Sequence, residues 1–281
     1  MHEWTDSFQT FRSTAGDVRW AAFGDPAHEP VVLLHGTPWS SYSWRAVAAA
    51  LSGRYRVFVW DMPGYGASEK FEGQDVSVGA QGKVFTELLA HWGLDEPLVV
   101  GHDFGGAVAL RAHLLHGAKY RRLVLADPVA LTPTGSEFFR LVRENAEVFG
   151  KLPSHLHRAL VREYVASSGG FGLHPRVVDA LAEPWLGEVG QAAFYRQIAQ
   201  AEEHYFAEVE ARCPELDLPV LICWGAEDRW IPVARADELA ALIPGARLRV
   251  LPGAGHLVQE DSPAELTAAL LEFLGGETAG N

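Results

Sequence analysis

The sequence predicts an α/β protein in which helices cover both faces of a mostly parallel sheet. The first observation is that short, continuously apolar runs recur, as at residues 31–35, 97–101 and 219–224. Such runs are typical of strands that are buried on both faces. The second observation is that segments of helical periodicity separate these runs, which is the order that βαβ units produce.

The expected elements follow from this alternation. Strands are expected near residues 7–12, 17–23, 31–35, 56–60, 97–101, 122–126, 219–224 and 247–251. Amphipathic helices are expected near residues 41–52, 79–92, 104–116, 233–243 and 263–274. Between Pro128 and about Leu216, helical periodicity and aromatic residues replace the strand pattern. We therefore predict a core domain of residues 1–127 and 217–281, with a helical lid of residues 128–216 inserted after the sixth strand.

Composition limits the classes of function. The 281 residues, of which 48% are hydrophobic, suffice for one large core and a lid. A net charge of −13 argues against nucleic acid or an anionic membrane as a partner. Met1–Asp6 lacks the character of a signal peptide, and no apolar run is long enough to span a bilayer. Cys213 and Cys223 are expected to be reduced thiols, which favours a cytoplasmic protein. The expected oligomeric state is a monomer or a homodimer.

The stretch 101–106, GHDFGG, carries the most chemical information. It has the glycine spacing of a nucleophile elbow, in which a strained strand-to-helix turn presents the central side chain. That residue is Asp103, where serine is usual. Because an ordinary aspartate has a pKa of about 3.9, it is an anion at neutral pH and needs no base to activate it.

The carboxylate of Asp103 suits displacement at a saturated carbon. Attack on an ester would form a mixed anhydride, whereas opening a strained ring or expelling a halide forms an ordinary ester of Asp103. Water can then cleave that ester at its carbonyl. The sequence thus favours alkyl transfer followed by hydrolysis, with an unreactive elbow in a binding protein or a decayed enzyme as the alternative.

Candidate partners of Asp103 follow later strands. Asp228 lies in the loop after the predicted seventh strand, and His256 lies in a Gly-rich loop after the eighth. We expect His256 to take a proton from the hydrolytic water and Asp228 to orient its ring. Asp127, at the end of the sixth strand, is the alternative acid, with a supporting role or a turn cap as its other interpretations.

The loop His35-Gly36-Thr37-Pro38 follows an apolar strand and is the fourth element of the site. Hydrolysis of an ester builds negative charge on oxygen, which N–H donors stabilise. The backbone N–H groups of Thr37 and Phe104 are the expected oxyanion hole. No cofactor or metal is expected, because His155-Leu156-His157 has no carboxylate or cysteine cluster beside it and is interpreted as part of a solvated lid helix.

Together these motifs resemble the α/β-hydrolase superfamily, in the branch of epoxide hydrolases, haloalkane dehalogenases and haloacetate dehalogenases. The resemblance covers nearly the whole chain, and its motifs are HGTP at 35–38, DMPGYGAS at 61–68, the elbow, WGAED at 224–228 and GAGH at 253–256. It implies the α/β-hydrolase fold, with a mostly parallel eight-stranded sheet, helices on both faces and a lid. It also implies the chain order nucleophile, acid, histidine. The implied partners are a small hydrophobic substrate and water.

Departures from the resembling families separate their activities. Haloalkane dehalogenases hold the halide with a tryptophan after the nucleophile, often joined by an asparagine in the HGxP loop. Here those positions are Phe104 and Thr37, although Trp39 could substitute as a donor. Haloacetate dehalogenases bind the substrate carboxylate with arginines just after the nucleophile, whereas the first arginine here is Arg111.

Epoxide hydrolases polarise the ring oxygen with tyrosine hydroxyls from the lid. Tyr195, in the stretch AFYRQ, resembles such a residue, and Tyr164 is a weaker second candidate. The predicted substrate-binding residues are His35, Pro38, Trp39, Phe149, Tyr164 and Tyr195. Epoxide hydrolysis is therefore the first prediction and dehalogenation the second. A non-catalytic binding or sensor protein on the same fold is a further alternative.

Overall fold

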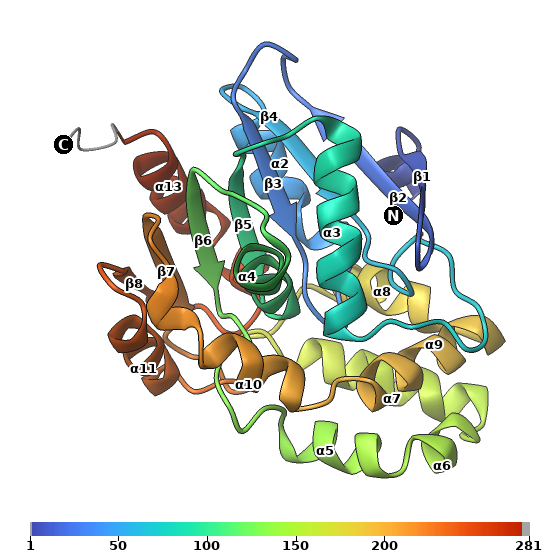
Figure 1. Ribbon diagram of the computed structural model, residues 1–281. Helices are drawn as coiled ribbons and strands as arrows, with labels where there is room; N and C mark the ends of the chain where they lie inside the picture. Colours follow the sequence, from blue (N-terminus) through green and yellow to red (C-terminus); the bar gives the residue numbers. More distant parts are fainter. Residues whose placement is uncertain (1, 277–281) are drawn as a thin grey trace.

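The computed structural model describes residues 2–276 and shows one eight-stranded sheet, as predicted (Figure 1). Its strands are β1 (Gln9–Ser13), β2 (Gly16–Phe23), β3 (Pro30–Leu34), β4 (Arg56–Trp60), β5 (Leu98–His102), β6 (Arg122–Ala126), β7 (Val220–Gly225) and β8 (Arg247–Leu251). Their order in the sheet is β1-β2-β4-β3-β5-β6-β7-β8. β2 pairs antiparallel with β1 and β4, and the other neighbours pair in parallel. The ends of the predicted core domain, Met1 and residues 277–281, lie outside the described residues.

Helices account for most of the remaining chain. Those associated with the sheet are α1 (His2–Thr5), α2 (Arg45–Leu51), α3 (Val78–Trp92), α4 (Phe104–His116), α11 (Ala234–Leu242), α12 (Val258–Asp261) and α13 (Pro263–Leu274). Those between β6 and β7 are α5 (Glu137–Glu144), α6 (Ala146–Gly150), α7 (Ser154–Ala166), α8 (Pro175–Ala182), α9 (Gly187–Ala199) and α10 (His204–Glu210). The predicted helix 41–52 begins as a 3₁₀ turn, Ser41–Trp44. Within the described part of the chain, no helix is both long and apolar enough to cross a membrane.

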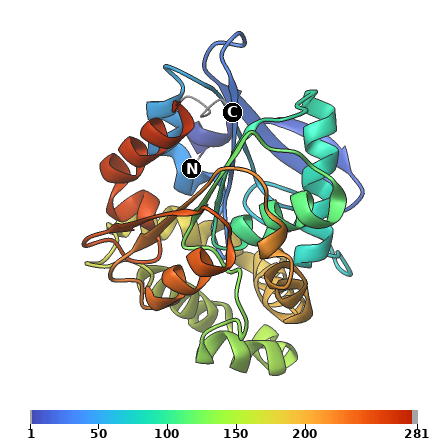
Figure 2. The same ribbon diagram turned by 60° about the vertical axis from the view of Figure 1, so that its left-hand side comes forward.

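The central strands β3 to β7 are buried nearly throughout, and their side chains alternate between the two faces, whereas the edge strands β1 and β8 are mostly exposed. In β3, Val32 and Leu34 belong to one buried apolar cluster, and Val31 and Leu33 belong to the other. Figure 2 shows helices on either side of the sheet, with α13 in red on one side and α3 in teal on the other. A strand that is buried on both faces needs apolar residues at nearly every position, and this is the pattern that predicted these strands from the sequence.

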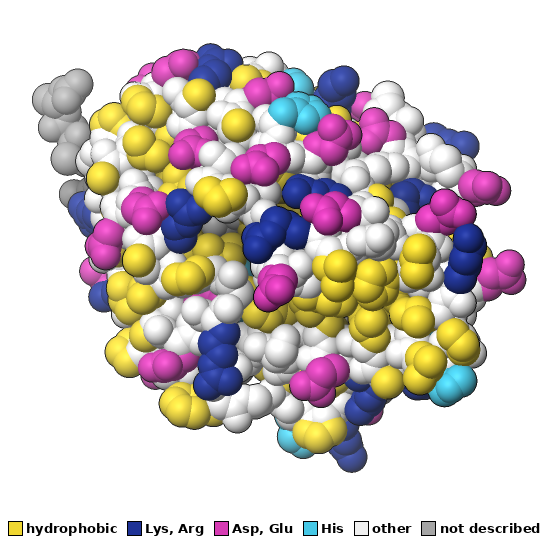
Figure 3. Space-filling model, turned by 90° about the horizontal axis from the view of Figure 1, so that it is seen from below, with side chains coloured by type: hydrophobic (Ala, Val, Ile, Leu, Met, Phe, Trp, Pro, Cys, Tyr) yellow, Lys and Arg dark blue, Asp and Glu magenta, His cyan; other side chains and the backbone are white. Residues whose placement is uncertain are grey.

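Helices α5 to α10 lie together below the sheet in Figure 1, and the arrow of β6 points toward them. The carboxyl ends of the parallel strands thus face this helical group, which is where α/β sheets place their ligands. On the outer side of the group, the view from below shows apolar side chains gathered in a band right of the centre, with charged side chains around it (Figure 3). Exposed apolar residues on these helices include Leu141, Val148, Leu156 and Val189.

Candidate active site

Asp103 occupies a strained turn between β5 and α4. Its backbone angles are φ 52° and ψ −120°, a region that a residue other than glycine rarely adopts. The Asp103 N–H donates to the Ala126 carbonyl (3.1 Å), while the Asp103 carbonyl accepts from the N–H groups of Gly106 (3.0 Å) and Val129 (3.2 Å). These bonds hold the strained residue and fix the direction of its side chain.

Two glycines allow the chain to approach Asp103 closely. A Cβ on Gly36 would lie 2.3 Å from the Cβ of Asp103. A Cβ on Gly105 would lie 2.5 Å from the Leu34 carbonyl oxygen. Since real Cβ atoms do not tolerate such distances, the spacing of glycines in both motifs follows from packing of the loop after β3 against the elbow.

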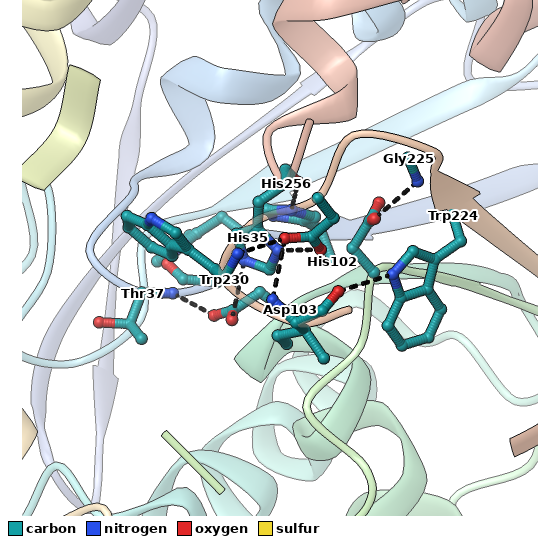
Figure 4. A network of polar contacts seen from close by, with 12 residues as sticks. His35, Thr37, His102, Asp103, Trp224, Gly225, Trp230 and His256 are labelled. Atoms are coloured by element: carbon teal, nitrogen blue, oxygen red, sulfur yellow. Dashed lines mark hydrogen bonds and ion pairs between the residues drawn. The ribbon is translucent and has the colours of Figure 1, made fainter. Parts of the chain in front are cut away.

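The two carboxylate oxygens of Asp103 have different surroundings (Figure 4). Oδ1 accepts a hydrogen bond of 2.6 Å from the backbone N–H of Thr37. Oδ2 lies 3.2 Å from Nε2 of His256. Phe104 begins α4, so its N–H is one of those at the helix start that lack an intrahelical acceptor. One oxygen therefore meets the predicted oxyanion donor, and the other meets the predicted base.

His256 and Asp228 form a buried pair. Nδ1 of His256 lies 2.8 Å from Oδ2 of Asp228, whose other oxygen accepts from the N–H groups of Trp230 (2.8 Å) and Ile231 (2.9 Å). Burial opposes the charged form of His256, but Asp228 and Asp103 outweigh it and raise the pKa of His256 well above its ordinary value. Burial likewise opposes ionisation of Asp228, but His256 and the two N–H donors lower the pKa of Asp228 overall. Asp228 is thus an ionised partner of the imidazole ring.

Asp127, the alternative acid, is buried beside this pair without a hydrogen bond to His256. Its Oδ1 accepts from the Gly225 N–H (2.8 Å), and its Oδ2 has no hydrogen-bond partner among the described residues. Burial and the charge of Asp228 raise the pKa of Asp127 well above its ordinary value. The geometry therefore favours Asp228 as the acid that orients His256, with Asp127 as a neutral neighbour.

Asp127, Asp228 and His256 also form the single group in residues 2–276 whose ligand atoms, all within 4.8 Å of one another, could hold a metal ion. Asp228 and His256 already satisfy each other through a hydrogen bond. Asp127 favours its protonated form, which is a poor metal ligand. The donor set fits proton handling better than cation binding.

The Asp103 carboxylate lines a cavity of about 300 Å³. The lining residues are Thr37, Asp103, Phe104, Pro128, Val129, Leu131, Pro133, Thr134, Gly135, Ser136, Phe139, Tyr164, Phe206, Trp224, Trp230, Ile231, Pro232, Arg235 and His256. The Tyr164 ring stacks on Trp230 (4.4 Å between centroids), and Trp230 stacks on His256 (5.1 Å). Most of this lining is apolar or aromatic, as a hydrophobic ligand requires.

Tyr195 and Phe149, two predicted substrate-binding residues, do not line this cavity. The Tyr195 hydroxyl hydrogen-bonds to Nδ1 of His157 (2.9 Å), and the Phe149 ring packs against Tyr195. His157 is itself buried, so the expectation of a solvated helix is wrong at that residue. Because successive residues turn by about 100° around a helix, Tyr195 and Gln197 point in nearly opposite directions, and Gln197 faces the core.

His35, Pro38 and Trp39 also lie outside the cavity wall. The two ring nitrogens of His35 hydrogen-bond to the Gly36 carbonyl (2.8 Å) and the Met62 N–H (2.9 Å). The Pro38 carbonyl accepts from the indole N–H of Trp185 (2.7 Å). Trp39 is fully buried behind Trp230, with 5.5 Å between ring centroids. These residues build the loop instead of contacting the cavity, and of the six candidates only Tyr164 lines it.

Three further residues contact the site, and none of them was predicted from the sequence. Nε2 of His102 lies 2.8 Å from the His256 carbonyl, and burial lowers the pKa of His102 to about 4, so a neutral ring supports the His256 loop. Trp230 stacks on His256, and Gln197 hydrogen-bonds to Thr37. His102 could have been found from its place next to Asp103, whereas no sequence signal marked Gln197.

The comparison with protein families agrees with this fold. Residues 31–270 match the model of the alpha/beta hydrolase family. The chain belongs to this family. It is therefore a hydrolase enzyme of the α/β fold.

Individual relatives of this alpha/beta hydrolase differ in activity. The chain is 28% identical to "Haloalkane dehalogenase 2" of Mycobacterium tuberculosis over 94% of each chain. It is 29% identical to "Epoxide hydrolase A" of the same organism, over 90% of this chain and 92% of the relative. A solved structure of an alpha/beta hydrolase fold protein from Burkholderia ambifaria is 44% identical, with a TM-score of 0.90 over 94% of this chain and 97% of that one.

Proposed function

We propose that this hydrolase attacks a saturated carbon with the Asp103 carboxylate, and that water activated by His256 then cleaves the resulting ester. The best candidate reaction is hydrolysis of an epoxide in a small hydrophobic molecule. The supporting observation is the division of roles at Asp103, where Oδ1 meets the Thr37 N–H and Oδ2 lies beside His256 on the wall of the cavity. No resident cofactor enters this scheme.

In the first step, Oδ2 of Asp103 forms a bond to an epoxide carbon as the ring carbon–oxygen bond breaks. The electron pair of that bond moves to oxygen as a developing alkoxide. The free protein holds His256 as a cation between two carboxylates, because Asp228 and Asp103 raise its pKa. Esterification removes the charge of Asp103, so the pKa of His256 falls and its proton passes to the alkoxide directly or through solvent.

In the second step, neutral His256 takes a proton from water, which attacks Cγ of the ester. The electron pair of the carbonyl moves to Oδ1, where the Thr37 N–H already donates. Collapse of the intermediate breaks the bond between Cγ and the former Oδ2. The leaving oxygen takes the proton of the hydroxyl that water added to Cγ, so the diol departs and the Asp103 carboxylate is restored beside the His256 cation. Asp228 stabilises the imidazolium that forms in this step.

The polar groups of the cavity favour an epoxide over a halide. Of the cavity tryptophans, Trp224 donates its indole N–H to the Ile231 carbonyl and Trp230 donates to Ser167. The described residues offer the Tyr164 hydroxyl no hydrogen-bond partner, and burial together with the Asp103 charge raises the pKa of Tyr164. A protonated phenol is therefore free to donate to a developing alkoxide.

Dehalogenation is the second candidate, since the haloalkane dehalogenase relative matches 94% of each chain. A departing halide is held best by free side-chain N–H donors, and Arg235 of the cavity wall already hydrogen-bonds to Glu238, Thr132 and Pro133. Phe104 has no side-chain N–H, and the hydroxyl of Thr37 donates to Gln197. Trp39 has an unpaired indole N–H but does not line the cavity. For this reason we propose dehalogenation only as the second candidate.

We further propose that residues 128–216 act as the lid and that residues 1–127 and 217–281 form the core. Helices α5 to α10 fall within this segment, between β6 and β7. Both parts contribute to the cavity: Phe139 and Tyr164 come from the proposed lid, and Asp103 and Trp230 come from the core. The lid would thus exclude water from the first step and select apolar substrates.

A single-turnover reaction in H₂¹⁸O tests the ester mechanism. With enzyme in excess over an epoxide, the water oxygen should enter the Asp103 carboxylate, and the diol formed in the first turnover should carry no label. Mass spectrometry of the diol and of the peptide that contains Asp103 reads both outcomes. A labelled diol with unlabelled Asp103 would mean direct attack of water on the substrate. Halide release without consumption of any epoxide would instead identify a dehalogenase.

A further inference from the structure

Gln197 connects the proposed lid to the loop that contacts Asp103. It lies on α9 with its side chain only 2% exposed. Its Oε1 accepts hydrogen bonds from the hydroxyls of Thr37 (2.8 Å) and Tyr65 (3.0 Å). The backbone N–H of Thr37 in turn donates to Oδ1 of Asp103 (2.6 Å). Two hydrogen bonds made by Thr37 thus join a side chain of α9 to the Asp103 carboxylate.

A second contact, from the short turn Glu183–Trp185 just before α9, holds Pro38, the residue after Thr37. The indole N–H of Trp185 donates to the Pro38 carbonyl (2.7 Å). The carbonyl of Trp185 is itself hydrogen-bonded to Nε2 of His157 on α7 (2.8 Å). Side chains from between β6 and β7 therefore contact both Thr37 and Pro38, so the position of the loop depends on these helices.

Packing alone does not explain an amide at residue 197. Both partners contact Oε1, and Nε2 of Gln197 is buried without a hydrogen-bond partner in the described structure. An unpaired buried donor is unfavourable, and an apolar side chain of similar size would avoid it. What the amide provides, and an apolar side chain would not, is the acceptor oxygen that faces Thr37 and Tyr65.

We propose that Gln197 is a positioning residue that holds the Thr37 N–H against Asp103, so that the oxyanion contact exists only while the lid is seated on the core. This inference rests on the proposed function and assigns a role to a lid residue. Ester hydrolysis places a full negative charge on Oδ1, whereas attack by Oδ2 removes charge from the carboxylate. Loss of Gln197 should therefore affect hydrolysis more than formation of the ester.

Variants of Gln197 distinguish its role as a hydrogen-bond acceptor from a role in packing alone. Gln197→Met keeps the length of the side chain but removes the acceptor. It should slow hydrolysis of the alkyl-enzyme by about 5- to 50-fold, less than the ~10²–10³-fold loss expected when a whole oxyanion donor is removed. Formation of the ester should change by less than about 3-fold. Gln197→Glu retains an acceptor oxygen and should restore most of the hydrolysis rate.

Gln200, the C-cap residue directly after α9, provides a matched control. Its Oε1 accepts from the Val76 N–H (2.7 Å), and its Nε2 donates to the Gln74 carbonyl (3.0 Å). Gln200→Met thus removes contacts between α9 and the core without touching Thr37, and it should leave hydrolysis nearly unchanged. An equal loss in Gln200→Met and Gln197→Met would mean general loosening of the lid and would overturn the proposal.

Hydrogen–deuterium exchange tests the same idea without a substrate. Peptides that contain the Thr37 amide should exchange faster in Gln197→Met than in the wild type, and at the wild-type rate in Gln200→Met and Gln197→Glu. Thr37→Val, which removes the same hydroxyl bond, should match Gln197→Met and provides the test if Gln197→Met fails to fold. If the Thr37 amide exchanges at the wild-type rate in a folded Gln197→Met or in Thr37→Val, Gln197 does not position this amide and the proposal is overturned. If the exchange pattern is as expected but no electrophile forms an adduct on Asp103, the positioning role of Gln197 would be supported and the proposed function would be refuted.

Discussion

Asp127 and Asp228 are neighbouring buried carboxyl groups whose pKa values are shifted in opposite directions. Asp228 shares a 2.8 Å hydrogen bond with His256 and receives two backbone N–H donors, which together stabilise its anion. Asp127 receives one backbone N–H, and the charge of Asp228 disfavours a second anion beside it. The pair therefore contains one carboxylate and one carboxylic acid.

This difference predicts unequal effects of two similar substitutions. Asp228→Asn removes the charge that stabilises the imidazolium and should slow ester hydrolysis by roughly 10²–10⁴-fold. Asp127→Asn should stay within about 5-fold of the wild type, because an amide reproduces the acceptor and the donor of a protonated carboxyl group. Single-turnover kinetics of both variants provides the measurement. The reverse order would move the role of acid to Asp127.

The raised pKa of Asp127 predicts a pH-dependent gain in stability for Asp127→Asn. Above the ordinary aspartate pKa of 3.8, the unfolded chain loses its proton while the folded protein keeps it. The unfolded state then binds fewer protons, so the wild-type free energy of unfolding falls as the pH rises from 3.8 towards the folded pKa. The stability of Asp127→Asn relative to wild type should therefore increase from acid to neutral pH in urea titrations. A constant difference would show that Asp127 is ionised in the folded protein.

The charge of Asp103 should be visible in the titration of His256. Since Asp228 and Asp103 both raise the pKa of His256, Asp103→Asn should lower it while Asp228 keeps part of the shift. NMR titration of the His256 ring in the wild type and in Asp103→Asn measures this change. The variant should remain folded, because the two side chains are nearly isosteric, and should lose turnover. An unchanged His256 pKa would exclude the fall in pKa that the second reaction step requires.

Two tyrosines of the proposed lid predict contrasting results. Tyr164→Phe should slow ester formation from epoxides by roughly 10–10³-fold, as expected for loss of one donor to the developing alkoxide. Tyr195→Phe is the matched control and should have little effect, because its hydroxyl is bound to His157. Rapid-quench measurement of the covalent ester distinguishes them. A slow Tyr195→Phe beside a normal Tyr164→Phe would require a different arrangement of the lid.

The central strands were predictable because burial on both faces forces apolar residues at nearly every position. The predicted runs 56–60 and 122–126 coincide with the buried strands β4 and β6. The predicted run 247–251 coincides with β8, although this edge strand is mostly exposed. The convergence of Asp103, Asp228 and His256 was also predictable, since each follows a parallel strand and the carboxyl ends of such strands meet at one edge. Their chemical roles remain proposals that the experiments above address.

The inner surface of the lid was not predictable in the same way. Helical periodicity predicted helices between Pro128 and about Leu216 but not the bounds of each one. In α9, both Tyr195 and Gln197 are buried, together with Phe194 and Ile198. A helix that is buried around most of its circumference gives no apolar stripe from which its rotation can be determined. Which of these side chains faces the loop that contacts Asp103 depends on tertiary packing. This explains why the sequence favoured Tyr195 and gave no signal for Gln197.

The proposed function requires Asp103 to become covalently bonded to the substrate. His256→Gln should block hydrolysis of the ester while leaving Asp103 able to attack. Intact-mass spectrometry of His256→Gln, after incubation with panels of epoxides and haloalkanes, should show a stable increase equal to the whole mass of an epoxide. Peptide mapping should place it on Asp103, and the double variant Asp103→Asn/His256→Gln should stay unmodified. Absence of any adduct on Asp103 from both panels, in a folded protein, would contradict the account.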